Sequence, residues 1–148
     1  MAIKKNPTKI AAERELGRIA DICLAKLKMP HAQLGFFLLA DAAMERLRKA
    51  HLPKHAKPLD VLSFPEPKQF PHPEEKRGKV LGEIYLNWSL LKSDPERLRF
   101  LFIHGLLHLA GFTHAGKSDT MKMEKQERKL LASIPTLSPH AIKSRYRN

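Results

Sequence analysis

Three histidines within one short run constrain the fold of this chain more than any other feature of the sequence. His104 and His108 are four residues apart, so they lie on one face if the segment is a helix. Gly111 can adopt the left-handed conformation that ends a helix, and the next turn can bring His114 back toward the same point. We therefore predict a helix over residues 95–110 that carries the first two of three converging imidazoles.

Three converging neutral imidazoles suit a borderline-soft divalent cation, most naturally Zn²⁺. Three protein ligands leave one position open for water, which is typical of catalytic rather than structural zinc. A purely structural site needs a fourth protein ligand, and none is evident near the run; His72 or His140, for example, is distant in sequence. The simpler alternative is that His104 and His108 only share a partly exposed helix face.

The residue after the first histidine decides against one class of enzyme. Zinc peptidases with two histidines four apart carry a glutamate there as general base, and this chain has Gly105. A glycine instead gives room for a bulky group or for a close backbone approach. The base must come from elsewhere, or the metal must activate the water, since zinc lowers the pKa of bound water to roughly 7.

Two carboxylates at expected strand positions are candidates for a supporting catalytic role. Asp60 and Glu83 can each orient a ligand imidazole or relay a proton if they face the histidines. The alternative for each is an ordinary solvated carboxylate at the end of a strand. These two residues complete the predicted site with the metal ligands His104, His108 and His114.

The charge balance points to polyanionic partners. The 148 residues contain 27 Lys and Arg against 15 Asp and Glu, a net charge of +12. Such an excess favours nucleic acid first and an anionic membrane surface second, although a basic surface can also serve solubility alone.

Cys23 is the only cysteine, which excludes an internal disulfide, and we expect it to be a small buried hydrophobe. No segment approaches the roughly 18 apolar residues of a membrane span, so we expect a soluble, cytoplasmic protein.

The apolar pattern predicts an α+β fold in one domain over residues 1–148. We expect three or four strands in a small, mostly mixed sheet, packed by about four to five helices. The expected helices are 6–27, capped by Asn6 or Thr8; 41–50, capped by Asp41; 95–110, capped by Ser93 or Asp94; and 118–133. The expected strands are 33–39, 60–64, ended by Pro65, 80–87 and a further one at 2–4, and alternation in 80–87 puts Leu81, Glu83 and Tyr85 on one face. We expect a flexible loop at 65–79 and a loosely ordered basic tail at 134–148.

The histidine run closely resembles the signature of the YbeY family, bacterial endoribonucleases that mature ribosomal RNA. Residues 58–65 are similar to the family segment Pro-Thr-Asp-Val-Leu-Ser-Phe-Pro, and residues 81–84 are similar to its Leu-Gly-Asp-Ile strand. Four residues of the last helix match the family spacing: Met123, Glu127, Leu130 and Leu131. The resemblance covers about half of the chain, residues 57–131, whereas the first 50 residues agree only in the order of helix, strand and helix.

The resemblance implies a fold, an activity and a set of partners. The fold is a small α+β sheet with helices, and the activity is zinc-dependent cleavage of single-stranded RNA. The implied role is maturation of the 3′ end of 16S ribosomal RNA and ribosome quality control, with the small subunit and assembly factors as partners. His104, His108 and His114 match the ligands of the family's single zinc ion, and the basic composition is what an RNA substrate requires.

The sequence also departs from the family pattern. Thr113 replaces an aspartate before the third histidine, and Leu59 replaces a threonine. A family arginine thought important for activity falls in the register of Leu52 and Pro53. The nearby Lys54 could supply a charge but not the bidentate geometry of arginine, and Arg48 or Arg77 are the other candidate replacements. Two alternatives therefore stay open: a ribosome-associated RNA-binding or assembly factor with a metal site and weak catalysis, or a metal-dependent hydrolase of another substrate.

Overall fold

The computed structural model describes residues 8–52, 60–67 and 78–135 of the chain. These contain five helices and three strands: α1 (Lys9–Lys26), β1 (Gln33–Leu39), α2 (Asp41–His51), β2 (Val61–Pro65), β3 (Val80–Asn87), α3 (Trp88–Leu91), α4 (Pro95–Leu109) and α5 (Lys117–Ala132). The predicted α+β fold is confirmed. The strand expected at 2–4 lies outside the described residues, as does most of the loop expected at 65–79 and of the tail at 134–148.

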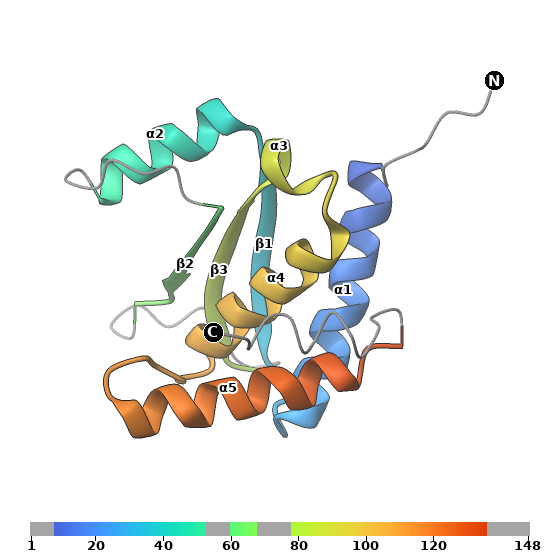
Figure 1. Ribbon diagram of the computed structural model, residues 1–148, viewed down its shortest axis with the longest axis vertical. Helices are drawn as coiled ribbons and strands as arrows, with labels where there is room; N and C mark the ends of the chain where they lie inside the picture. Colours follow the sequence, from blue (N-terminus) through green and yellow to red (C-terminus); the bar gives the residue numbers. More distant parts are fainter. Residues whose placement is uncertain (1–7, 53–59, 68–77, 136–148) are drawn as a thin grey trace.

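The strands form one mixed sheet in the order β1-β3-β2 (Figure 1). β1 runs parallel to β3, and β2 runs antiparallel to β3. Pro65 is the last residue of β2, whereas we had expected it to follow the strand; as the terminal residue it needs no backbone N–H for the ladder.

A β-bulge early in β3 corrects the predicted alternation of this strand. Gln33 pairs with Val80 and Leu34 with Gly82, so Leu81 is an extra residue on β3. The extra residue turns the Leu81 side chain into the core, where 4% of it is exposed. The expectation that Leu81 shares a face with Glu83 and Tyr85 was therefore wrong, because periodicity alone does not reveal a bulge.

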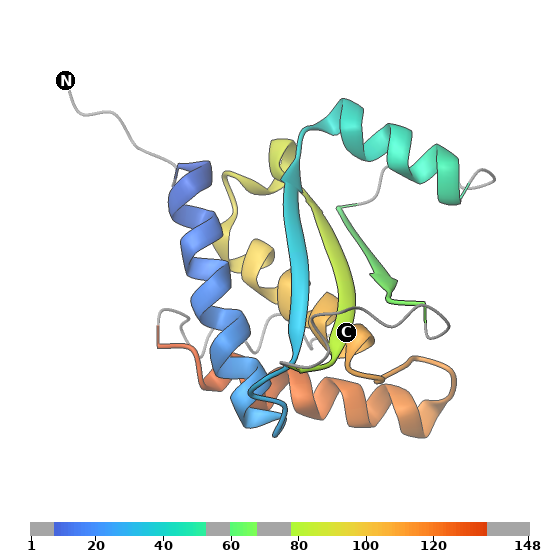
Figure 2. The ribbon, with the colours of Figure 1, turned by 180° about the vertical axis from the view of Figure 1, so that it is seen from behind.

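Helix α4 covers one face of the sheet and lies at the centre of the core. It packs on β2 and β3 and also contacts α1 and α5, and Figure 2 shows β1 and β3 in front of it when the molecule is seen from behind. The helix approaches the sheet closely at Gly105, where a Cβ atom would lie 3.2 Å from Cγ2 of Ile84. We expected Gly105 either to make room for a bulky group or to allow a close backbone approach, and the structure shows the close approach.

The opposite face of the sheet carries a row of aromatic rings. Phe37 and Tyr85 are stacked with ring centroids 5.1 Å apart, and Phe64 lies 5.7 Å from Tyr85. The ring of His51, the last residue of α2, lies beside that of Phe64, with the ring centroids 4.7 Å apart. The two faces of the sheet therefore differ: one is buried under α4, and the other presents partly exposed rings.

Two of the predicted helix caps are confirmed. The Thr8 hydroxyl accepts a hydrogen bond from the backbone N–H of Ala11 at 3.1 Å, and the Asp94 carboxylate accepts one from Arg97 at 3.2 Å. Both bonds satisfy backbone donors that a helix start leaves unpaired.

The expected cap of α2 was wrong. Ala40 occupies the cap position and makes no side-chain bond, while Asp41 is the first helical residue. Its carboxylate instead accepts a hydrogen bond of 2.7 Å from the buried amide of Asn87. Asn87 also caps α3, a helix too short to be seen from sequence periodicity.

Cys23 has the structural role that we expected. It is fully buried in the core, and burial raises the pKa of its thiol to about 12, which keeps the sulfur protonated and inert.

Among the helices that the structure describes, none combines the length and the apolar character needed to cross a membrane.

The bulge gives a test of the fold. Gly82 has a φ of +139°, and a Cβ atom there would lie 2.2 Å from the carbonyl oxygen of Phe64. We expect Gly82→Ala to lower the free energy of unfolding by about 2–3 kcal/mol in urea denaturation. Gly17→Ala, in α1 with open space around it, is the matched control and should raise it by about 1 kcal/mol. A Gly82→Ala protein as stable as the unmodified chain would contradict the strained bulge.

Candidate metal centre

The end of α4 is shaped by a turn at Gly111. The N–H of Phe112 bonds to the carbonyl of Leu107 at 3.0 Å, and the N–H of Gly111 bonds to the carbonyl of His108 at 3.1 Å. This pair of bonds is a Schellman motif, and Gly111 occupies its left-handed position with a φ of +107°. The turn reverses the chain after the helix, as the sequence predicted, and brings the following loop back beside His104 and His108.

The turn places all three histidines around one point. The Nε2 atom of His104 lies 3.2 Å from Nε2 of His108 and 3.4 Å from Nε2 of His114. One nitrogen from each ring falls within 4.8 Å of the others. Two nitrogens bound to a tetrahedral zinc at 2.0–2.1 Å are about 3.3–3.4 Å apart, so these separations fit that metal.

The other ring nitrogens of the two helical histidines have partners that fix their protonation. Nδ1 of His104 lies 2.5 Å from a carboxylate oxygen of Glu127, and Nδ1 of His108 lies 3.1 Å from the carbonyl oxygen of Phe112. Both partners accept hydrogen bonds, so we infer that both Nδ1 atoms donate. In a neutral ring this leaves the lone pair on Nε2, which points into the cluster. With these tautomers, the three rings could hold a cation between them.

Glu127 supports the cluster from a second helix. Its side chain in α5 is only 3% exposed, and it reaches His104 across the packed interface of α4 and α5. A carboxylate that accepts the second N–H of a ligand imidazole orients the ring and increases its basicity. The sequence placed Glu127 in the family spacing of the last helix but gave it no role. The available signal was an acidic residue within the apolar pattern of Met123 and Leu130.

The electrostatic environment favours neutral imidazole at His108. Burial lowers the pKa of His108 below its ordinary value, and the neighbouring His104 and His114 lower it further. A neutral ring is the form that binds a metal ion. His114, by contrast, is exposed at the surface, so the cluster opens to solvent on one side.

Asp60 is brought to the same helix face but not to the cluster. Its carboxylate accepts two hydrogen bonds from Arg97, from Nη2 at 2.7 Å and from Nε at 3.2 Å. Arg97 is seven residues before His104, which is about two turns, or roughly 10 Å, along the helix. We considered Asp60 as the carboxylate that orients a histidine ring. In the structure Asp60 binds Arg97, and Glu127 is the carboxylate that contacts His104.

Glu83 lies on the other face of the sheet. It is exposed and accepts a hydrogen bond of 2.7 Å from the hydroxyl of Tyr85, in the row of aromatic rings. Burial, together with this bond and the charge of Glu83, raises the pKa of Tyr85 to about 12. Because α4 and its histidines cover the opposite face, Glu83 is placed with Tyr85 and not with the metal ligands.

The comparison with known proteins agrees with this geometry. Residues 2–135 match the sequence profile of the family described as Endoribonuclease YbeY. The chain belongs to the YbeY endoribonuclease family. The resemblance in the histidine run and the two upstream segments is thereby confirmed over nearly the whole chain.

Several curated members of the family are similar to this chain. It is 33% identical over 124 residues to an Endoribonuclease YbeY of Nitrobacter hamburgensis, covering 77% of this chain and 64% of the relative. It is 34% identical over 112 residues to one of Chelativorans sp., covering 70% and 68% of the two chains. A third, of Geobacter sulfurreducens, is 28% identical over 132 residues and covers 82% and 85%. The chain thus spans a little less than two thirds of the Nitrobacter protein.

The link between the two helices can be tested without measuring activity. We expect Glu127→Gln to weaken zinc binding by about tenfold, because outer partners of ligand histidines contribute roughly 10–100-fold to metal affinity. The measurement is competition for zinc with a coloured chelator. Glu124→Gln, the same change three residues earlier in α5, is the control and should bind zinc as the unmodified chain does. Equal affinities in all three proteins would show that Glu127 does not support the site.

Proposed function

We propose that this chain is a zinc-dependent, single-strand-specific endoribonuclease of the bacterial cytoplasm. Its role would be maturation of the 3′ end of 16S ribosomal RNA and ribosome quality control, with the small subunit and assembly factors as partners. The observation that carries the proposal is the convergence of three Nε2 atoms, from His104, His108 and His114, at the open end of α4. Zinc bound there would polarise a phosphate oxygen and activate the attacking water.

The accessibility of the cluster supports catalysis over a structural metal. The side chain of His104 is 24% exposed and His114 is exposed, so a substrate phosphate can reach the three nitrogens. Among the described residues, the cluster contains three histidines and no fourth ligand from Cys, Asp or Glu. This leaves room for water and substrate, as catalytic zinc sites require.

The charges around the cluster support a polyanionic substrate. Arg97 lies on the same face of α4 as His104, and 42% of its side chain is exposed although it also pairs with Asp60. Three exposed lysines, Lys117, Lys122 and Lys125, line a shallow hollow at the start of α5, just after His114. The positive charge of these side chains attracts the phosphate backbone of RNA without regard to sequence.

Arg48 is not placed to replace the family arginine. It is 6% exposed, and its guanidinium binds the Glu45 carboxylate at 2.5 Å and the Leu52 carbonyl at 3.3 Å. This commits the side chain to holding the end of α2. Arg77, the other candidate, lies outside the described residues. We therefore propose Arg97 as the described arginine that contacts the RNA backbone.

The proposed activity can be tested with purified protein and RNA. We expect zinc-loaded protein to cut single-stranded ribosomal RNA and to leave a duplex of the same sequence intact. His108→Ala should lower the rate by more than roughly 100-fold, since loss of a ligand exceeds loss of an outer partner. A chelator should abolish cleavage and added zinc should restore it.

His31→Ala is the matched control for this test. His31 is exposed and lies outside the cluster, so its loss should leave the rate unchanged. Equal cleavage by the His108→Ala protein would mean that the observed nuclease is a contaminant and would refute the proposal.

The ion pair between Arg48 and Glu45 favours a second candidate, an RNA-binding assembly factor with a metal site and weak catalysis, because it leaves Arg48 unable to replace the family arginine. This function requires the basic surface but not turnover. It predicts salt-sensitive binding of ribosomal RNA that survives His104→Ala, together with only slow zinc-dependent cleavage by the unmodified chain. Efficient cleavage that disappears with His108 would exclude it.

The role of Arg97 has its own test. We expect Arg97→Gln to raise the KM for RNA about fivefold with little effect on kcat, because a partly exposed charge contributes up to about 1 kcal/mol. Zinc affinity should not change. Arg46→Gln, which removes an exposed arginine of α2, is the control. An unchanged KM in the Arg97→Gln protein would show that this side chain does not bind substrate.

A further inference from the structure

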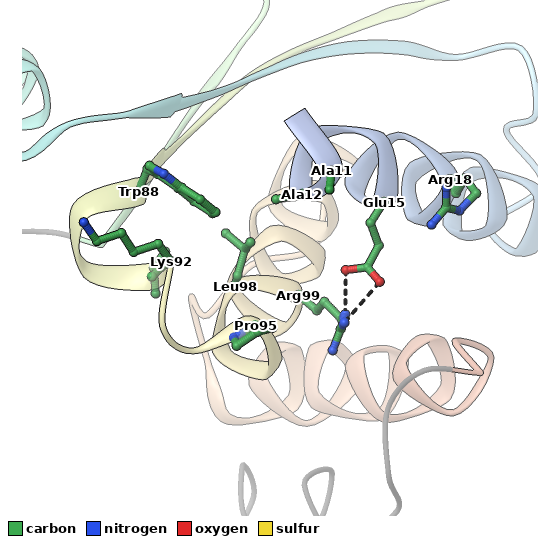
Figure 3. Close-up of a pocket in the computed structure, with 10 residues that line it drawn as sticks. Ala11, Ala12, Glu15, Arg18, Trp88, Lys92, Pro95, Leu98 and Arg99 are labelled. Carbon is green, nitrogen blue, oxygen red and sulfur yellow. Dashed lines mark hydrogen bonds and ion pairs between the residues drawn. The ribbon is translucent and has the colours of Figure 1, made fainter. Parts of the chain in front are cut away.

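A small hollow lies between α1, α3 and α4, separate from the metal centre (Figure 3). Its volume is about 220 Å³. From α4 it is lined by Pro95, Leu98 and Arg99. At about 100° per residue, Pro95 and Arg99 lie on the opposite side of the helix from His104 and His108, and Leu98 lies about a quarter to a third of a turn from them. Ligands of the hollow and of the histidine cluster therefore do not share contacts.

The walls of the hollow combine an aromatic ring with small apolar side chains. Ala11 and Ala12 of α1 leave the space open, and Leu91 and Leu98 add apolar surface. Trp88, at the start of α3, forms one side and is half-buried, so part of its indole remains available for contact. A flat apolar space beside an indole fits a planar aromatic group, which can stack on the ring.

The charged residues around the hollow are mainly basic. Glu15 accepts hydrogen bonds from Arg99 at 2.9 and 3.1 Å, and Figure 3 shows this ion pair across the hollow from Trp88. The pair neutralises the one carboxylate of the lining. Arg18 and Lys92 also line the hollow and are exposed, and neither forms an ion pair with a carboxylate in the described part of the chain. Figure 3 shows them at opposite ends of the hollow, Lys92 beside Trp88 and Arg18 beyond the Glu15–Arg99 pair, so Lys92 is the cation available to an anionic ligand that contacts the indole.

We propose that this hollow binds one nucleotide unit, with its base against Trp88 and its phosphate near Lys92. The volume is below the roughly 300–1,000 Å³ of ordinary small-molecule sites, so the base fills the hollow while ribose and phosphate remain outside. Stacking on an aromatic ring accepts every base, and Lys92 selects for a phosphate. The site extends the proposed function, because nucleotides are the units of RNA, but it does not depend on cleavage.

Trp88 gives a direct readout because it is the only tryptophan of the chain. The experiment titrates the full-length protein with adenosine monophosphate and uridine monophosphate while tryptophan emission is recorded, with free tryptophan amide correcting for absorption. We expect saturable quenching by both nucleotides and weaker binding of adenosine and of inorganic phosphate. No saturable change with either nucleotide would overturn the proposal.

Variants separate stacking in the hollow from general attraction to a basic protein. Ala11→Leu fills the hollow with a good helix former and keeps every charge, so nucleotide affinity by equilibrium dialysis should fall about tenfold. Ala25→Leu, at an exposed position of the same helix, should leave the affinity unchanged. Lys92→Gln should weaken binding about threefold, whereas Arg18→Gln, at the end of the hollow far from Trp88, should leave the affinity unchanged. Equal affinities of the Ala11→Leu and Ala25→Leu proteins would refute a site in the hollow.

Two further arms identify the source of the nucleotide and keep the test independent of catalysis. A single-stranded oligoribonucleotide that binds more tightly than the mononucleotide, and loses affinity in Ala11→Leu, assigns the site to RNA. Binding of mononucleotide alone assigns it to a free nucleotide. The His108→Ala protein should bind nucleotide as the unmodified chain does, so failure of the nuclease proposal and failure of this one give different results.

Discussion

The hydrogen bond between His104 and Glu127 is the interaction on which the metal centre depends. A carboxylate that is 97% removed from solvent is costly unless a donor compensates for the lost water, and the imidazole N–H of His104 is that donor. In return, the carboxylate determines which nitrogen of the ring carries the proton and which faces the cluster. The packing of α5 on α4 and the ligand chemistry of His104 therefore rely on the same contact. A change that separates the two helices would also release the ligand.

The turn at Gly111 has a comparable double role. It brings His114 back to the end of the helix, and it also places the carbonyl of Phe112 where it accepts the second N–H of His108. One local backbone conformation thus provides the third ligand and orients the second. Local geometry of this kind is encoded within a few residues, which explains why the histidine run could be interpreted from sequence.

The parts of the structure that the sequence predicted are those determined by local patterns. The helix that begins at Pro95, the strand 33–39 and the caps Thr8 and Asp94 follow from periodicity and from unpaired backbone donors. The parts that it missed depend on contacts between distant segments. Glu127 is 23 residues from His104, and nothing in its neighbourhood names its partner. The inward side chain of Leu81 follows from a bulge set by pairing with β1. Asp60 and Glu83 could be assigned to strands, but their partners Arg97 and Tyr85 could be found only in three dimensions.

Helix α4 presents different side chains on the two faces that do not pack on the sheet. Gly105 brings the helix onto Ile84, so its position relative to the sheet is fixed and both remaining faces keep a defined exposure. One face presents His104, His108 and, two turns earlier, Arg97; the opposite face borders the hollow beside Trp88. Arg48 is held by Glu45, whereas Arg97 of α4 and the lysines at the start of α5 keep their charge at the surface. A phosphate held there would be fixed by the same two helices that fix the metal ligands. Its distance from the metal would then be set by helix packing and would not require a loop to close.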